Sequence, residues 1–257
     1  LSHAGLGIDT VLDGAGDDTV EGQEGDDAFF AGAGADAYGG GAGTKDKLYY
    51  SLSLTGLVID LANPQNNTGI ALGDTVTGVE WVYASDFDDT LIASADIDRI
   101  FGQAGDDTLV DAAGSQFMSG GTGADTFQLV AADGAQDRIT DFELDVDVID
   151  LSAWGATALS DLSITERLTG QGAPTGDLIV AYGSESLRLD GLDASQIMSF
   201  DADEFVFAPY TGDGVVSGTS GNDAIDGLFA DTDGDVINDS GQLIQAGQGN
   251  DTIFDGA

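Results

Sequence analysis

Cysteine is absent from this chain of 257 residues, and basic residues are almost absent. Without cysteine, neither a disulfide nor a thiolate metal site can hold the fold together. Only 6 Lys and Arg stand against 47 Asp and Glu, which gives a formal net charge of −41. A chain with this charge repels itself. Something must therefore offset the charge if the chain folds.

The sequence also lacks the usual motifs of catalysis. His3 is the only histidine, so there is no His-Glu-x-x-His zinc motif, and no Gly-x-Ser-x-Gly elbow is present. Acidic pairs such as Asp145 and Asp147 are expected among so many acids. No apolar run approaches the length of a membrane helix, and no charged and then apolar leader opens the chain. We predict no enzymatic activity in this chain and no membrane-spanning segment.

The few basic residues are scattered along the sequence. This scatter argues against nucleic-acid binding and against a basic groove for an acidic polysaccharide. The six positions are Lys45, Lys47, Arg99, Arg138, Arg167 and Arg188.

What the chain does contain is glycine, aspartate and a substantial apolar fraction. Hydrophobic residues make up 42% of the sequence, which argues against acidic disorder over the whole length, and there are 39 glycines. In the opening, aspartates recur every nine residues, each with a glycine two positions before it and an apolar residue two positions after it. The first such set is Gly7, Asp9 and Val11. Because the glycine, the aspartate and the apolar residue all recur in four consecutive units, the sequence contains a nine-residue repeat.

The repeat occurs in three arrays. The first contains Asp9, Asp18, Asp27, Asp36 and, after one inserted residue, Asp46. The second contains Asp89, Asp98, Asp107 and Asp125, with Gln116 where another aspartate is expected. The third begins at GTSGNDAID and resumes at AGQGNDTIF, with Asp223 and Asp251 in the aspartate column. The chain starts with Leu and ends on the start of another copy, so we expect it to be a piece of a longer protein.

A physical reason for this spacing is a stack of coils joined by turns. Glycine allows turns with positive φ, and the apolar residue of a short strand points inward. If two repeats form one coil, an aspartate faces its counterpart 18 residues on, about 4.8 Å away. Two carboxylates at that distance repel by roughly 3 to 4 kcal/mol at an effective dielectric near 20. Calcium, a hard cation with oxygen ligands, reverses this sign.

The register predicts which aspartates share a calcium ion. Asp27 pairs with Asp9 and with Asp46 on one edge, and Asp18 pairs with Asp36 on the other. In the second array Asp89, Asp107 and Asp125 share one edge, while Asp98 faces Gln116, whose amide supplies no charge. The alternative interpretation is a glycine-rich solenoid with solvated aspartates and no metal.

An acidic loop in the third array offers a further candidate site. Alternate carboxylates around Gly234 can converge on one cation, and the loop partly resembles calcium loops of the EF-hand and thrombospondin types. Gln242 stands where a bidentate Glu is expected, so a calcium site and a solvated turn both remain open, and the neighbouring repeats favour calcium. The candidate ligands are Asp231, Asp233, Asp235 and Asp239.

The repeat resembles the calcium-binding nonapeptide of the RTX family, Gly-Gly-x-Gly-x-Asp-x-apolar-x, over about half of the chain. The stretch DRITDFELDVDVIDLSAWG resembles the block that closes the roll in serralysin-type proteases. The resemblance implies an all-β fold in which parallel β-roll (RTX solenoid) segments alternate with antiparallel β-sandwich or cap segments. It also implies calcium-binding turns and, for a bacterial protein of this kind, export by type I secretion.

We predict five segments. These are a first RTX β-roll (1–48), a strand spacer or cap (49–83), a second β-roll (84–130), a serralysin-like β cap (131–208) and a third RTX array with the acidic loop (209–257). Alternation within 48–62 predicts two strands, around Tyr50–Leu54 and Leu57–Leu61, and Trp81 is expected over the open end of the second roll. Residues 177–192 read as a hairpin about Gly183 and Ser184, and 201–208 as its last strand.

The functional prediction is a calcium-binding RTX segment of a secreted or cell-surface protein that folds on calcium after export and has a structural or assembly role. It requires several calcium ions and allows self-association or contact with neighbouring repeats of the parent chain. One alternative is the carrier and folding module of a larger exported enzyme, such as a protease, lipase or polysaccharide-modifying enzyme. Another is an adhesin or surface-layer unit.

Overall fold

The computed structural model describes residues 2–130, 133–197, 200 and 204–208, together with four short strands between 215 and 253. The chain forms two compact units, Leu1–Ala208 and Pro209–Ala257. In the second unit, β21 (Val215–Ser217) pairs in parallel with β23 (Leu243–Gln245), and β22 (Ala224–Ile225) with β24 (Thr252–Ile253).

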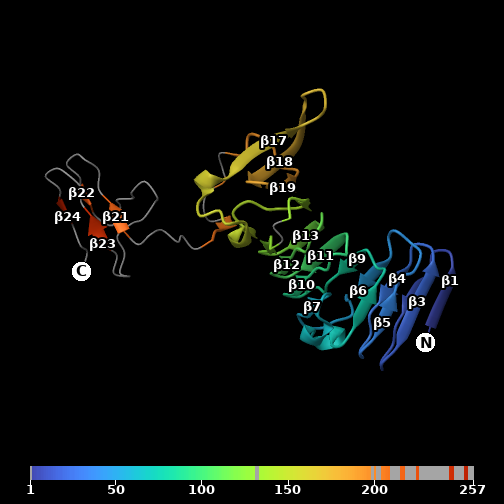
Figure 1. Ribbon diagram of the computed structural model, residues 1–257. Coiled ribbons are helices and arrows are strands. Elements are labelled where there is room, and N and C mark those ends of the chain that lie inside the picture. Colours follow the sequence, from blue (N-terminus) through green and yellow to red (C-terminus); the bar gives the residue numbers. More distant parts are fainter. Residues whose placement is uncertain are drawn as a thin grey trace. The chain divides into compact units, whose positions relative to one another are not determined.

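The described residues form an all-β structure in which strands are joined by turns and four short 3-10 segments (Figure 1). Most strands are three residues long, and glycine-rich turns follow several of them, such as 13–16, 31–34 and 40–43. The 3-10 segments are Pro64–Asn66, Gly69–Ala71, Ser152–Trp154 and Leu159–Asp161. Within the described ranges, no helix has the length and apolar character needed to cross a bilayer.

One face of the roll is a ten-stranded sheet. Its order is β17-β18-β19-β15-β13-β11-β9-β6-β4-β2, and all pairs from β2 to β19 are parallel. The strands are β2 (Thr10–Leu12), β4 (Ala28–Phe30), β6 (Lys47–Tyr49), β9 (Trp81–Tyr83), β11 (Arg99–Ala104), β13 (Phe117–Thr122), β15 (Gln136–Ile139), β17 (Ser163–Leu168), β18 (Pro174–Tyr182) and β19 (Glu185–Asp190).

Two smaller parallel sheets form the other face. The first has the order β1-β3-β5-β8 and the second β20-β16-β14-β12-β10-β7. Their strands are β1 (Ser2–Leu6), β3 (Thr19–Glu24), β5 (Ala37–Gly39), β8 (Thr75–Thr77), β7 (Val58–Asp60), β10 (Thr90–Ile92), β12 (Thr108–Val110), β14 (Thr126–Gln128), β16 (Val148–Asp150) and β20 (Phe205–Val206).

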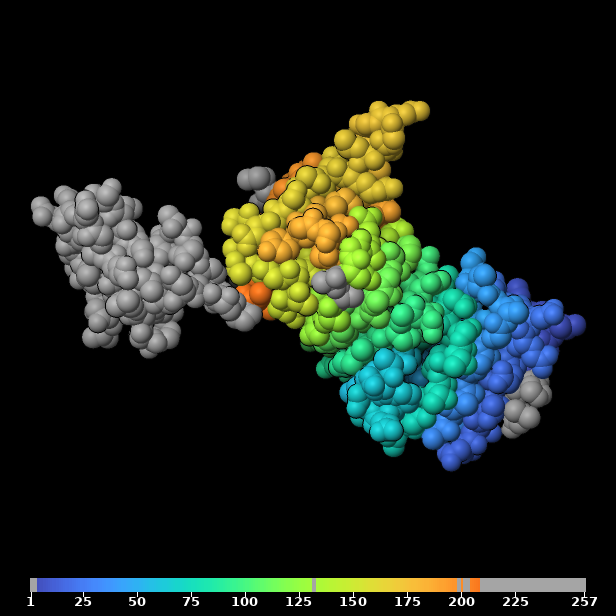
Figure 2. Space-filling view, in the orientation of Figure 1, coloured from blue at the N-terminus to red at the C-terminus, as the bar shows by residue number. Residues whose placement is uncertain are grey.

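The core is a stack of apolar residues, one from the centre of each short strand. Phe29, Leu48, Val82, Ile100 and Met118 occupy equivalent positions in adjacent strands of the large sheet, and all are buried. They are the apolar column of the repeat, so the parallel β-roll is confirmed. Figure 2 shows the sequence colours following one another in bands along the first unit, as a stack of coils requires.

The stretch after the first array differs from the sequence prediction. Strand β6 ends at Tyr49, and Leu52 and Leu54 are 49% and 85% exposed, so the strand predicted around Tyr50–Leu54 is wrong. Trp81 lies in β9, in the middle of the large sheet, and not over an open end. The reason is that β6, β7, β8 and β9 pair in register with strands of the repeats, so the sheets continue through 49–83.

Residues 131–208 extend and close the roll. The predicted hairpin is confirmed, since β18 and β19 are antiparallel with Tyr182 opposite Glu185. The prediction that 201–208 forms its last strand is wrong, because β20 pairs in parallel with β16 on the other face. There Phe142, Phe200 and Phe205 stack in series beside Phe127 and cover the apolar end of the coils.

The basic residues are not scattered in space. Four of them occupy equivalent positions in parallel strands of the large sheet. In strand order β6, β9, β11, β13, β15 and β19, the aligned residues are Lys47, Trp81, Arg99, Phe117, Arg138 and Arg188. The sequence spacing between these residues is irregular, which hides their alignment. The spacing in the sequence therefore gives no ground against a basic surface on this sheet.

Candidate metal centres

Each strand of the large sheet from β2 to β9 begins after an acidic residue, and these residues are linked from coil to coil. The backbone amide of Asp9 donates to Oδ1 of Asp27 at 2.8 Å, and that of Asp27 donates to Oδ1 of Asp46 at 2.6 Å. The amide of Asp46 donates in turn to Oε2 of Glu80 at 2.9 Å. We call this series the first carboxylate ladder. Asp9, Asp27 and Asp46 are thus adjacent along one edge, as the register predicts, and their sharing of calcium stays a prediction.

The second carboxylate ladder runs along the other face. Amides of Asp18 and Asp36 donate to Oδ1 of Asp36 and Asp74, at 2.8 and 2.9 Å. Further along, the amide of Asp89 donates to Oδ1 of Asp107 at 2.7 Å and that of Asp107 to Oδ1 of Asp125 at 2.9 Å. Asp18 and Asp36, and likewise Asp89, Asp107 and Asp125, are thus adjacent as the register predicts, and calcium binding between them stays a prediction.

Four ladder carboxylates each have one oxygen without a partner. The Oδ2 atoms of Asp9, Asp27, Asp46 and Asp107 are buried and accept no hydrogen bond within the part of the chain that the structure describes. A buried charged oxygen without a partner is costly. Because one oxygen of each carboxylate holds the adjacent coil and the other is unsatisfied, these residues fit a hard cation with oxygen ligands.

Without a bound cation, burial and repulsion between carboxylates raise the pKa of several ladder aspartates. Burial, followed by the charges of Asp89 and Asp125, raises the pKa of Asp107 to about 7. Burial also raises the pKa of Asp74 to about 7 and that of Asp125 to about 6, with neighbouring aspartates adding to both shifts. The ladders therefore favour a positive partner, which can be a proton or a metal ion.

Glycines allow the acidic residues and the turns to pack this closely. A Cβ at Gly120 would lie 2.1 Å from Oδ2 of Asp125, so any side chain there would displace the carboxylate. Gly25 has φ +123°, and a Cβ on it would lie 1.9 Å from the carbonyl oxygen of Gly7 in the preceding coil. The glycines of the repeat thus have a steric role in both the turn and the ladder.

Additional acids stand one residue before the ladder aspartates. Oδ1 of Asp17 accepts from the amide of Ala35, and Oδ1 of Asp106 accepts from that of Ala124. These carboxylates lie in exposed turns, where they hold the next coil in place. They could also contribute ligands from the solvent side of a turn.

One acidic cluster lies at the start of the second ladder. Carboxylate oxygens of Asp13, Asp18 and Asp36 lie within 4.8 Å of one another. The hydroxyl of Tyr38 donates to Oδ2 of Asp13 at 2.7 Å and lies 3.4 Å from Oδ2 of Asp36. The cluster brings together two predicted ligands, Asp18 and Asp36, with Asp13, which the sequence prediction did not include.

The decayed repeat differs from its neighbours as the sequence indicates. Asp98 and Gln116 precede Arg99 and Phe117, which face each other in β11 and β13. Oε1 of Gln116 accepts from Ala112, and its Nε2 donates to the carbonyl of Ala113. The amide therefore uses both polar atoms within its own turn, and the facing carboxylate of Asp98 receives no charged counterpart from this residue.

Four ladder residues were missed by sequence reasoning. Insertions separate them from the arrays, so the nine-residue count does not reach them, although each stands two positions before a buried or partly buried apolar residue. Asp-x-apolar following an interrupted array is the signal that could have found them. The residues are Asp74, Glu80, Asp137 and Asp147.

The predicted ligands of the third array, Asp223, Asp231, Asp233, Asp235, Asp239 and Asp251, lie outside the described residues. Calcium binding by these six, and by the nine predicted residues of the first unit, stays a prediction.

A family model for the RTX calcium-binding nonapeptide repeat matches residues 3–38, 83–114 and 234–257, in four copies. Just over a third of the chain is matched. A comparison with curated protein sequences finds no match.

Solved structures similar to this chain include a lipase and a subunit of an epimerase. The extracellular lipase LipA of Serratia marcescens is 20% identical with a TM-score of 0.30, over 79% of this chain and 38% of the lipase. The AlgE6R2 subunit of the Azotobacter vinelandii mannuronan C5-epimerase is 24% identical with a TM-score of 0.35, over 50% of this chain and 93% of the subunit. The chain thus spans well under half of the lipase.

The chain carries RTX calcium-binding nonapeptide repeats in a parallel β-roll, and repeats of this family bind calcium ions.

Proposed function

We propose that this chain is a calcium-dependent folding segment of an exported bacterial protein, in which calcium ions occupy the turns between the coils and hold the roll together. The observation that carries the proposal is the pair of carboxylate ladders, where Asp9, Asp27, Asp46 and Asp107 each keep a buried oxygen without a partner. Nine predicted residues of the first unit belong to these turns, namely Asp9, Asp18, Asp27, Asp36, Asp46, Asp89, Asp98, Asp107 and Asp125.

The free energy of calcium binding supports folding at extracellular calcium concentrations and unfolding at cytosolic ones. Extracellular calcium sites have dissociation constants of about 10⁻⁴ to 10⁻³ M, so they fill outside the cell and stay empty in the cytosol. At about 10 mM calcium, each such site stabilises the folded state by roughly 1.4 to 2.7 kcal/mol. Because a net charge of −41 opposes compaction, several sites together decide whether the chain folds. This behaviour suits a chain exported unfolded, by type I secretion, and folded at the cell surface or in the medium.

The five segments predicted from the sequence follow from the same proposal. The arrays at 1–48, 84–130 and 209–257 supply calcium turns, while 49–83 and 131–208 supply coils and a closing cap with fewer repeat aspartates. We propose a structural or assembly role for the whole chain and no catalytic activity of its own. The parent protein supplies any catalysis.

Calcium counting combined with light scattering tests this function. The purified 257-residue chain is dialysed against calcium, and the bound ions are counted by atomic absorption. Several ions per chain are expected, with growth in particle size under calcium but not under magnesium at equal ionic strength if the role is assembly. Fewer than two bound ions would contradict the calcium-folding proposal, and a calcium-loaded compact monomer would contradict only the assembly role. Turnover of polysaccharide, lipid or peptide substrates by the chain would contradict the non-enzymatic part.

A further inference from the structure

Cations and aromatic rings alternate in a straight row on the outer face of the large sheet. The strand register places Lys47, Trp81, Arg99, Phe117 and Arg138 next to one another on β6, β9, β11, β13 and β15. Lys47 and Arg99 lie over the Trp81 ring, at 5.4 and 4.6 Å from its centroid. Arg99 and Arg138 lie over the Phe117 ring, at 4.2 and 4.9 Å. We call this series the cation-aromatic row.

A second row of rings runs beside it, two residues further along the same strands. Phe30, Tyr49, Tyr83 and Phe101 stack face to face, with centroids 4.8, 4.4 and 4.2 Å apart and interplanar angles of 15° or less. Tyr49 and Tyr83 are therefore covered on both ring faces, while Phe30 and Phe101 each stack on one side only. Burial and the neighbouring Tyr49 raise the pKa of Tyr83 to about 12, so its hydroxyl stays protonated.

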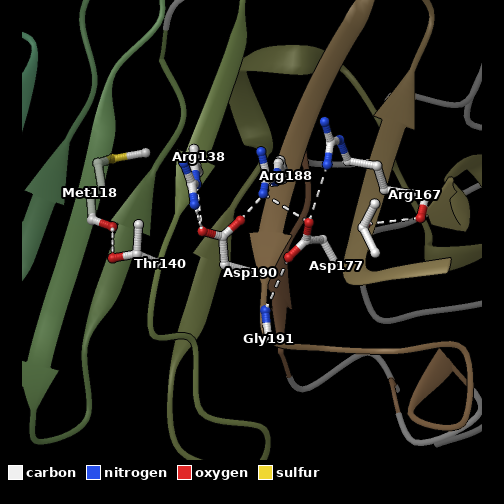
Figure 3. Close-up of polar contacts among 9 residues, drawn as sticks. Met118, Arg138, Thr140, Arg167, Asp177, Arg188, Asp190 and Gly191 are labelled. Atoms are coloured by element: carbon white, nitrogen blue, oxygen red, sulfur yellow. Dashed lines mark hydrogen bonds and ion pairs between the residues drawn. The ribbon is translucent and has the colours of Figure 1, made fainter. Parts of the chain in front are cut away.

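Over the ranges that the structure describes, some basic residues of the row are paired with carboxylates, and others are free to bind an anion. At one end, Arg138 and Arg188 pair with Asp190, Arg188 also pairs with Asp177 at 2.8 Å, and Arg167 lies 3.5 Å from Asp177 (Figure 3). Lys47 and Arg99 have no carboxylate within ion-pair distance among the described residues. A guanidinium stacked on a ring keeps its edge N–H groups for a planar anion. Lys47 and Arg99 are thus partly exposed cations held in place by Trp81.

Their spacing fits a regular linear anion. Lys47 and Arg99 are two strands apart, which corresponds to roughly 9 to 10 Å. Everywhere else the chain is strongly acidic, with 47 acids and 6 basic residues in all, so an anionic partner is attracted to this row and repelled by most other surfaces. The row runs perpendicular to the strands, as an extended polymer lying across them would.

The chemistry of the face selects among polyanions. Nucleic-acid bases bind by stacking on open ring faces, but the rings here are covered by each other or by cations. Neutral sugars that stack on aromatic faces meet the same obstacle. Carboxylates suit Arg99 and Lys47, and sugar hydroxyls suit the phenol groups of Tyr49 and Tyr83 beside them. A polymer with both groups in regular order is a uronic-acid polysaccharide.

We propose that the cation-aromatic row binds a linear acidic polysaccharide, whose carboxylates pair with Lys47 and Arg99 and whose hydroxyls contact Tyr49 and Tyr83. The row lies on the sheet face, one residue after the ladder positions Asp46, Glu80 and Asp98. This binding requires the folded roll but no catalysis.

Affinity measurement on the full chain tests the proposal, with calcium held constant. Polygalacturonate is the probe, and dextran is the neutral control. Poly-glutamate and single-stranded DNA are the other polyanions tested. Binding of each is measured by affinity electrophoresis or calorimetry. Wild type should bind polygalacturonate, with weakening by added salt, and should bind the other three at least about tenfold more weakly. No binding to polygalacturonate, or equal binding to poly-glutamate or DNA, would overturn the proposal.

Matched variants separate the row from net charge. Lys47→Gln with Arg99→Gln should weaken binding at least about tenfold, because each charge-assisted contact contributes about that factor or more. Lys45→Gln with Arg167→Gln removes the same charge outside the row and should change affinity by less than about twofold. The double variant Lys47→Arg with Arg99→Lys keeps both charges and should retain binding. It replaces the Lys47→Gln with Arg99→Gln variant as the test if that variant misfolds. Equal affinity of the two neutral double variants would contradict the assignment.

Discussion

The backbone amide of Asp89 donates a hydrogen bond to Oδ1 of Asp107, 2.7 Å away and 18 residues further along the chain. Oδ2 of the same Asp107 is buried without a partner, and the Asp107 amide donates to Asp125. Asp107 therefore links three coils, through its carboxylate on one side and its backbone amide on the other. The same arrangement recurs along both ladders, so we propose that calcium binding and coil stacking are coupled.

Replacing Asp107 by Ala should raise the calcium concentration at the midpoint of folding by severalfold. The change removes a carboxylate shared by two turns and leaves the Asp89 amide without its acceptor. Asp193→Ala is the control, because Asp193 is an exposed residue in the turn after β19, away from both ladders. Circular dichroism during calcium titration measures both midpoints, and similar shifts in the two variants would contradict the role of the ladder.

Restoring the missing acid at Gln116 should add calcium dependence. In Gln116→Asp the new carboxylate faces Asp98 and lies next to Asp137, whose Oδ1 accepts from the residue 116 amide. We expect one more bound ion per chain and lower stability in chelator, because the added charge repels its neighbours without a cation. Gln171→Asp, in an exposed turn, should change neither quantity. Ion counting provides the first measurement, and thermal unfolding at a series of decreasing calcium concentrations provides the second.

Gly120→Ala should destabilise the calcium-loaded roll, since the new Cβ would lie 2.1 Å from Oδ2 of Asp125. A loss of at least about 1 kcal/mol is expected from the overpacking and the displaced carboxylate. Gly170→Ala is the matched control, because a Cβ there meets nothing within 4 Å. Chemical unfolding in saturating calcium should separate the two variants, and equal stability would rule out the steric role of Gly120.

Lowering the pH should stabilise the folded chain without calcium and weaken the binding of calcium to it. In the folded state without cations, burial and like charges raise the pKa of Asp107 and Asp74 to about 7 and of Asp125 to about 6. These groups bind protons in the folded state before they do in the unfolded state, so stability in chelator should rise as the pH falls from about 7 towards about 4. With calcium present, protons compete for the same oxygens, so the calcium affinity of the folded chain should fall over the same range, and calcium should add less stability at lower pH.

Circular dichroism at several pH values, in chelator and in fixed calcium, measures both trends. Stability in chelator that increases with pH over this range would contradict the assigned direction of the pKa shifts.

The sequence predicts the roll and the ladder pairings because the repeat count alone fixes which aspartates meet. Asp9 and Asp27, or Asp107 and Asp125, are separated by 18 residues and two short strands. Asp74 and Glu80 could not be placed in the same way, since 38 and 34 residues separate them from their partners Asp36 and Asp46. The cation-aromatic row was hidden for the same reason, because Lys47 meets Trp81 across an insertion of irregular length. The register of such pairs depends on how the intervening turns pack.

Far-UV circular dichroism of the 257-residue chain, recorded in excess chelator and then during calcium addition, tests the central claim most directly. The buried carboxylates of both ladders require a positive partner, so at neutral pH the account predicts little β-structure in chelator and a cooperative gain of it at millimolar calcium that magnesium does not reproduce. Native β-structure that persists unchanged in chelator at neutral pH would contradict the account.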